Sequence, residues 1–126
     1  MSPYRRVAVD APAPDTVAAL RRELADRGIT EYAVVDHGHD MAAAGAPGFS
    51  AWTLVFGNPA GGAKLLARDL AAAVDIPLRI AVIGAVHGSE LLYRDMRTLL
   101  ADDMADVADA LTDVLADLAT AVREKG

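Results

Sequence analysis

The sequence predicts an α+β fold, a two-layer sandwich in which two helices cover one face of a mixed β-sheet. Segments of strand length alternate with longer stretches of helical periodicity, in the order βαββαββ. The short connections between strands favour antiparallel or mixed pairing. A heptad-patterned stretch over residues 95–124 follows and is typical of a long amphipathic helix.

Five segments have the pattern of strands. Residues 4–10 alternate apolar and polar side chains, residues 51–57 and 78–86 are apolar on both faces, and residues 30–37 and 90–94 complete the set. Because two helices cover one face of a sheet, something else must cover the other face. We therefore expect a homodimer to which the C-terminal helix contributes, with that helix packing either within its own chain or across the dimer.

Three segments have the pattern of helices. The first begins near Pro14 and ends at Gly28, which suits a left-handed C-terminal cap. Residues 60–75 repeat leucines at helical spacing and end before a proline. The C-terminal helix carries a strict apolar seam, formed by Leu100, Met104, Val107, Leu111, Val114, Leu118 and Ala121.

Length and composition favour one domain over residues 1–126, with a body at 4–94 and a terminal helix at 95–124. The chain lacks cysteine, which excludes disulfide frameworks, thiolate catalysis and iron–sulfur clusters. It contains no apolar run of membrane-spanning length and no secretory signal pattern. The expected location is therefore the cytoplasm.

The charge is unevenly distributed. The net charge is −6, and residues 95–124 hold eight acidic side chains against Arg97 and Arg123, whereas the preceding body is nearly neutral. Nucleic acids and membrane surfaces both require a basic face on the protein. We therefore expect neither as a partner.

The turn from Gly57 to Gly62 is the first candidate site. It lies between an apolar strand and a helix, where free N–H groups can bind a phosphate or a carboxylate and glycines allow close approach. The sequence leaves open whether Asn58, Gly61 and Gly62 bind such an anion or only cap the helix. A nucleotide P-loop is excluded, because Leu65 follows Lys64 where a Ser or Thr is required.

The second candidate site is the run Asp36-His37-Gly38-His39, followed by a long connection over residues 38–50. His37 is suited to general acid or base chemistry, with Asp36 holding the imidazole and the long loop closing a pocket. His37 and His39 would supply two metal ligands, but the spacing places no third one. We therefore predict no metal site, and the sequence identifies no cofactor.

These motifs occur in an order that is similar to a known family. Phe56-Gly57-Asn58-Pro59 is followed by Gly62, Leu65-Leu66 and the run from Ile76 to Val82. With the Asp36-His37 pair, the small-residue loop at 42–45 and Tyr93, the chain resembles the domain-of-unknown-function 302 family over residues 4–120. The resemblance implies a small α/β fold that is usually dimeric and has no established reaction.

Together these features predict a small, noncatalytic cytosolic homodimer that binds a small molecule, an anion being one candidate, between residues 38–50 and the Asn58 turn. Two alternatives stay open: an enzyme that uses His37 as general acid or base in the same cleft, and a module that recruits proteins through the C-terminal helix. Whether the chain is an enzyme is not decided by its sequence. The candidate ligand-binding residues are Asp36, His37, His39, Asn58, Gly61 and Gly62.

Overall fold

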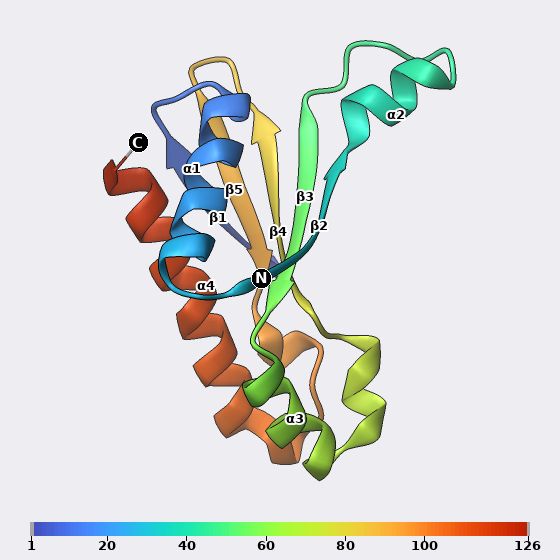
Figure 1. The fold of residues 1–126 in the computed structure, drawn as a ribbon, viewed down its shortest axis with the longest axis vertical. Coiled ribbons are helices and arrows are strands. Elements are labelled where there is room, and N and C mark those ends of the chain that lie inside the picture. Colours follow the sequence, from blue (N-terminus) through green and yellow to red (C-terminus); the bar gives the residue numbers. More distant parts are fainter. Residues whose placement is uncertain (1, 126) are drawn as a thin grey trace.

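The computed structural model describes residues 2–125 and shows an α+β fold with one five-stranded sheet (Figure 1). The strands are β1 (Tyr4–Val9), β2 (Thr30–Asp36), β3 (Ala51–Gly57), β4 (Leu78–Gly84) and β5 (Ser89–Arg94). The helices are α1 (Ala13–Asp26), α2 (His37–Ala43), α3 (Pro59–Arg68) and α4 (Ala105–Lys125), with 3₁₀ turns η1 (Leu70–Val74), η2 (Met96–Thr98) and η3 (Asp102–Met104). The predicted α+β class and two-layer arrangement are confirmed.

The sheet is antiparallel throughout, whereas we expected a mixed one. Its strand order is β1-β5-β4-β3-β2, and each neighbouring pair runs in opposite directions. The reason lies in the connections: α3 and η1 lie beyond one end of the sheet and lead back into β4 at that same end (Figure 1). When a connection leaves one strand and enters its neighbour at the same end of the sheet, the two strands run antiparallel. A parallel pair instead needs a connection that crosses to the opposite end of the sheet.

One face of the sheet is covered by α1 and α4, which lie against each other (Figure 1). We expected the helix at 60–75 to share this face with α1, but the C-terminal helix takes that place. The segment 60–75 is broken at Asp69, whose backbone is extended and whose carboxylate caps η1 by accepting a hydrogen bond from the Ala71 N–H at 3.0 Å. Two short pieces therefore fold beyond the sheet end instead of one helix along it.

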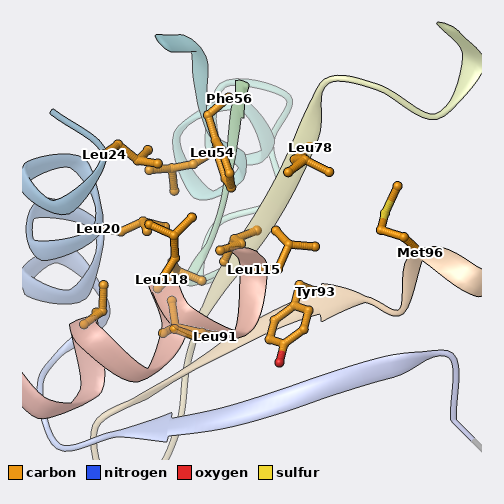
Figure 2. Packing of buried hydrophobic residues seen from close by; sticks show 14 of the residues in the cluster. Leu20, Leu24, Leu54, Phe56, Leu78, Leu91, Tyr93, Met96, Leu115 and Leu118 are labelled. Carbon is orange, nitrogen blue, oxygen red and sulfur yellow. The ribbon is translucent and has the colours of Figure 1, made fainter. Parts of the chain in front are cut away.

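The core lies between the sheet and these two helices (Figure 2). Alternate residues of the three central strands point into it, as the period of two requires. Leu20, Leu54, Phe56, Ile80, Val82, Leu91 and Leu118 are fully buried there. The described part of the chain has no helix that is long and apolar enough to cross a membrane.

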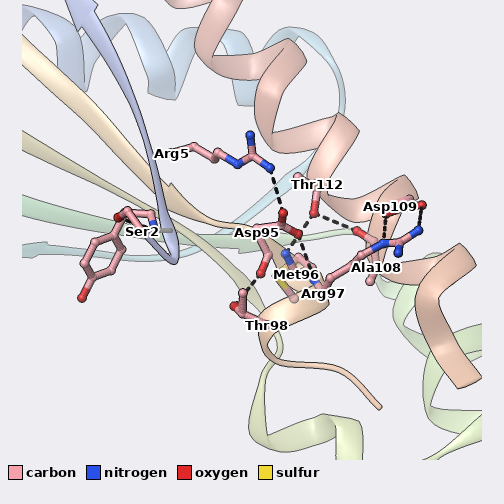
Figure 3. A network of polar contacts seen from close by, with 10 residues as sticks. Ser2, Arg5, Asp95, Met96, Arg97, Thr98, Ala108, Asp109 and Thr112 are labelled. Atoms are coloured by element: carbon pink, nitrogen blue, oxygen red, sulfur yellow. Dashed lines mark hydrogen bonds and ion pairs between the residues drawn. The ribbon is translucent and has the colours of Figure 1, made fainter. Parts of the chain in front are cut away.

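The C-terminal helix begins at Ala105, although the heptad pattern suggested a helix from residue 95. The Asp95 carboxylate caps η2 by accepting a hydrogen bond from the Arg97 N–H at 3.0 Å. The Thr112 hydroxyl accepts the Met96 N–H at 2.9 Å and donates to the Ala108 carbonyl (Figure 3). Such side-chain bonds to the backbone compete with helix formation, so this segment forms 3₁₀ turns tied to the side of α4.

The end of α4 is fixed to α1 by a largely buried carboxylate. Glu23 accepts hydrogen bonds from Lys125 Nζ and Arg27 Nε, each at 2.9 Å. These bonds, the one from Lys125 first, hold the pKa of Glu23 below its ordinary value. The carboxylate therefore stays ionised at neutral pH and links two elements that are distant in the sequence.

Candidate functional site

A cavity of about 590 Å³ lies at the α3 end of the sheet. Its volume is within the range of small-molecule sites, and such sites are mostly apolar. No charged side chain lines it, and Asn58 and Tyr32 are the lining residues whose side chains carry polar atoms. The apolar walls come from the start of β2, the end of β3, α3, the start of β4 with the segment before it, and α4. They include Ile29, Phe56, Leu65, Leu66, Ile76, Leu78, Val107, Leu111 and Val114.

Local sequence explains why this cavity stays open. Asn58 begins α3, and Pro59 occupies the first helical position, where its missing N–H is tolerated. Gly61 and Gly62 follow, and a Cβ added to either would find no atom within 4 Å. The absence of side chains at these two positions leaves space that leucine or phenylalanine would fill.

The heptad seam of the C-terminal helix serves two purposes within its own chain. Leu118 is fully buried in the core, whereas Val107, Leu111 and Val114 line the cavity. The other buried residues of α4 lie beside the seam, at Ala108, Leu115, Ala119 and Val122. The helix therefore packs in cis, and most of the seam is used inside the chain.

The N-terminus of α3 offers little to an anion. The Ala60 N–H donates to Asn58 Oδ1 at 3.0 Å, the Gly62 N–H donates to the Asn58 carbonyl at 2.8 Å, and Pro59 has no N–H. Within residues 2–125, this leaves the Gly61 N–H as the one first-turn donor without a hydrogen-bond partner. The turn is a helix cap in this structure, and no cationic group supplements it in the cavity wall.

The structure places the two candidate sites at opposite ends of β3. Asp36 pairs with Trp52 near the start of β3, whereas Asn58 follows its last residue. Seven residues of extended chain separate the ends by about 20 Å. Asp36, His37 and His39 are therefore not brought together with Asn58, Gly61 and Gly62 in one cleft.

His37 is held by a hydroxyl rather than by a carboxylate. Its Nε2 lies 2.7 Å from Thr53 Oγ1, and it is half-buried. The Asp36 carboxylate instead accepts a hydrogen bond from the His39 N–H at 2.9 Å and so caps α2. His37 lines neither of the two cavities described for this chain.

The connection over residues 38–50 is partly helical, where we expected a loop. Its first part is α2, which buries none of its side chains and extends away from the body (Figure 1). The side chain of His39 is exposed. Within residues 2–125, no three His, Asp or Glu side chains are grouped closely enough to hold a metal ion.

Comparison with known proteins assigns the chain to a family. The sequence profile described as "Domain of unknown function DUF302" matches residues 5–124. The chain belongs to the DUF302 family. No curated protein matches it with significance.

A solved structure of another DUF302 protein has the same fold. This is the crystal structure of an uncharacterized conserved protein from Bacillus stearothermophilus, which is 16% identical in sequence. The alignment covers 98% of this DUF302 chain and 100% of the other, with a TM-score of 0.89. At this identity the likeness shows the fold alone, and it carries no statement about ligand or reaction.

Three of the residues singled out in the sequence line the cavity of this DUF302 chain, whereas most of its lining was not anticipated. Asn58, Gly61 and Gly62 were expected at a site, whereas Ile29 and Tyr32 were not. Tyr32 lies at an irregularity in the β2–β3 register between Glu31 and Ala33, and its side chain is 52% exposed. An exposed aromatic residue beside an apolar strand was the one local signal available for it.

Proposed function

We propose that this DUF302 chain is a noncatalytic, cytoplasmic binding protein that takes a small, largely apolar molecule into the cavity at the α3 end of the sheet. The observation that carries the proposal is a cavity of about 590 Å³ without a charged lining residue. Burial of apolar ligand surface would drive binding. Asn58 and Tyr32 would orient any polar group, and an anionic end would meet the Gly61 N–H at the mouth.

Filling the cavity tests this proposal. Gly62→Leu is expected to weaken binding of the neutral fluorophore N-phenyl-1-naphthylamine by about tenfold or more, because the leucine side chain occupies space that the ligand needs. The variant should fold normally, since leucine favours a helix more than glycine does. Fluorescence titration measures the affinity.

Ala67→Leu is the matched control for that titration. Ala67 is exposed on α3 and does not line the cavity, so the same side chain added there should leave the affinity unchanged. Equal binding by wild type and Gly62→Leu would contradict the proposal. So would a wild-type protein that binds no apolar fluorophore.

We further propose that two copies associate through the sheet face opposite α1 and α4. The strand register places half-buried apolar side chains on that face, where neither of those two helices covers them. This arrangement does not use α4, which lies on the covered face. The apolar residues concerned are Val35, Val55, Ala81, Ile83 and Leu92.

A charge in the middle of this face should separate the two copies. Light scattering of the wild type is expected to give twice the 13.2 kDa of one chain. Ala81→Lys should reduce the mass to that of one chain, because the residues opposite Ala81 are Thr53 and Leu92 and neither offers a carboxylate to a buried lysine. Thr120→Lys, at an exposed site on α4, should keep the doubled mass. A wild type with the mass of one chain would contradict dimerisation.

A further inference from the structure

A second cavity of about 290 Å³ lies beside the apolar one, and Pro77 and Leu78 line both. Its lining differs in kind, because it includes two guanidinium groups. Arg79 comes from β4 and Arg94 from β5, and Asp75 is the one carboxylate. The rest of the wall is mainly apolar, so charges here are partly shielded from water.

Both arginines line the same cavity, at the end of the sheet where β4 and β5 no longer pair. The pairing of β4 with β5 ends at Ala81 and Leu92, two residues short of Arg79 and Arg94. Arg79 pairs with Val55 and Arg94 with Tyr4, so each arginine is held by its other neighbouring strand. Two like charges in one cavity favour the binding of an oppositely charged group.

Neighbouring carboxylates do not neutralise this pair. Within residues 2–125, neither Arg79 nor Arg94 has a carboxylate oxygen within 4.0 Å, although seven other cationic side chains form salt bridges. Glu90, on the same face, pairs with Arg6 at 3.4 Å. Asp95 pairs with Arg5 at 2.8 Å. One Asp75 carboxylate against two guanidiniums leaves the cavity positive, in a chain whose net charge is −6.

Arg94 is already held in place. Its guanidinium carbon lies 4.8 Å from the centre of the Tyr4 ring, a cation–π contact that orients the group. A guanidinium fixed in this way binds the two oxygens of a phosphate or a carboxylate with less loss of side-chain freedom. Arg79 is exposed and can close on the same anion.

We infer that this cavity is an oxyanion site in which Arg79 and Arg94 jointly bind the phosphate or carboxylate group of a small molecule. The anion supplies the counter-charge that both arginines lack. The site is separate from the apolar cavity, and it does not depend on the function proposed above.

Titration with inorganic phosphate at constant ionic strength tests the inference. Phosphate is expected to raise the melting temperature of the wild type, because a ligand that binds the folded state stabilises it. Arg79→Gln should weaken phosphate binding by about tenfold or more, since it removes a charge-assisted contact. Without phosphate, Arg79→Gln should melt close to the wild-type temperature, because Arg79 is exposed and forms no salt bridge within residues 2–125.

Arg22→Gln is the matched control. Arg22 is exposed on α1, lines neither cavity and has no salt bridge within the described residues, so its removal changes the net charge equally and should leave the phosphate response intact. A wild type without a phosphate response, or equal responses of wild type and Arg79→Gln, would overturn the inference. A further result would overturn the oxyanion site: Arg79→Gln lowers the mass of the protein in solution, and phosphate has no effect on the wild type. In that case a carboxylate of a second copy would be the counter-charge of the arginines. Gly62→Leu should bind phosphate normally, which separates this site from the apolar one.

Discussion

Leu118→Ala is expected to lower the free energy of unfolding by about 2–5 kcal/mol. Leu118 lies on α4 with no exposed surface, in the layer between that helix and the sheet (Figure 2). Its neighbours there come from other elements, among them Leu20 of α1 and Leu91 of β5. Because these neighbours are fixed by their own helix and strand, they cannot close the space that the lost atoms leave. Urea denaturation followed by circular dichroism measures the loss.

Val114→Ala on the same helix provides the comparison. Val114 is 37% exposed and faces the apolar cavity, so its truncation should cost about 1 kcal/mol or less. The contrast tests whether the C-terminal helix belongs to the core. If α4 were a separate module for recruiting proteins, Leu118→Ala would leave the unfolding of the α/β body unchanged. A loss below about 1 kcal/mol for Leu118→Ala would therefore contradict the packing described here.

Local patterns were sufficient to predict most of the strands and the first helix. Leu91 and Tyr93 alternate with polar or half-exposed neighbours along β5, and alternation of this kind depends on nothing beyond the strand itself. Gly28 has the positive φ of 67° expected for a left-handed cap after α1. In such cases the feature and its cause lie within a few residues of each other, so the sequence could reveal both.

Packing partners were harder to predict than elements. The heptad seam correctly indicated a helix. Helical spacing of apolar residues does not, however, identify the element against which they pack. Leu118 is fully buried in the core, whereas Leu111 packs against the core only in part and also lines a cavity. The start of the helix was placed ten residues too early, because the hydroxyl of Thr112 binds the Met96 N–H from a distant part of the sequence.

The same limit explains the candidate sites. Asn58, Gly61 and Gly62 lie in one turn, so the sequence could group them, and the structure places them in the lining of one cavity. Their separation from His37 follows from the register of β2 on β3, which is a long-range property. The cavity shared by Arg79 and Arg94 could not be predicted for a similar reason, since it depends on how the ends of β4 and β5 lie in the folded sheet.

Gly88 lies where the β4–β5 turn meets the end of β1, and it has a positive φ of 94°. A methyl group added to it would collide with the Val9 carbonyl oxygen and would lie 3.3 Å from the Ala11 N atom. Neither strand can easily move aside. Val9 is buried, and the hydroxyl of Ser89, the next residue, donates a hydrogen bond to the Ala11 carbonyl at 2.8 Å.

Gly88→Ala is therefore expected to lower the free energy of unfolding by about 3 kcal/mol, from backbone strain and from the displaced β1 together. Gly45→Ala separates the two contributions, because Gly45 has a similar φ of 89° and no atom within 4 Å of an added methyl group. That variant should lose about 1 kcal/mol, from strain alone. Chemical denaturation of both proteins measures the difference, and equal losses would show that the contact between the turn and β1 does not constrain the sheet.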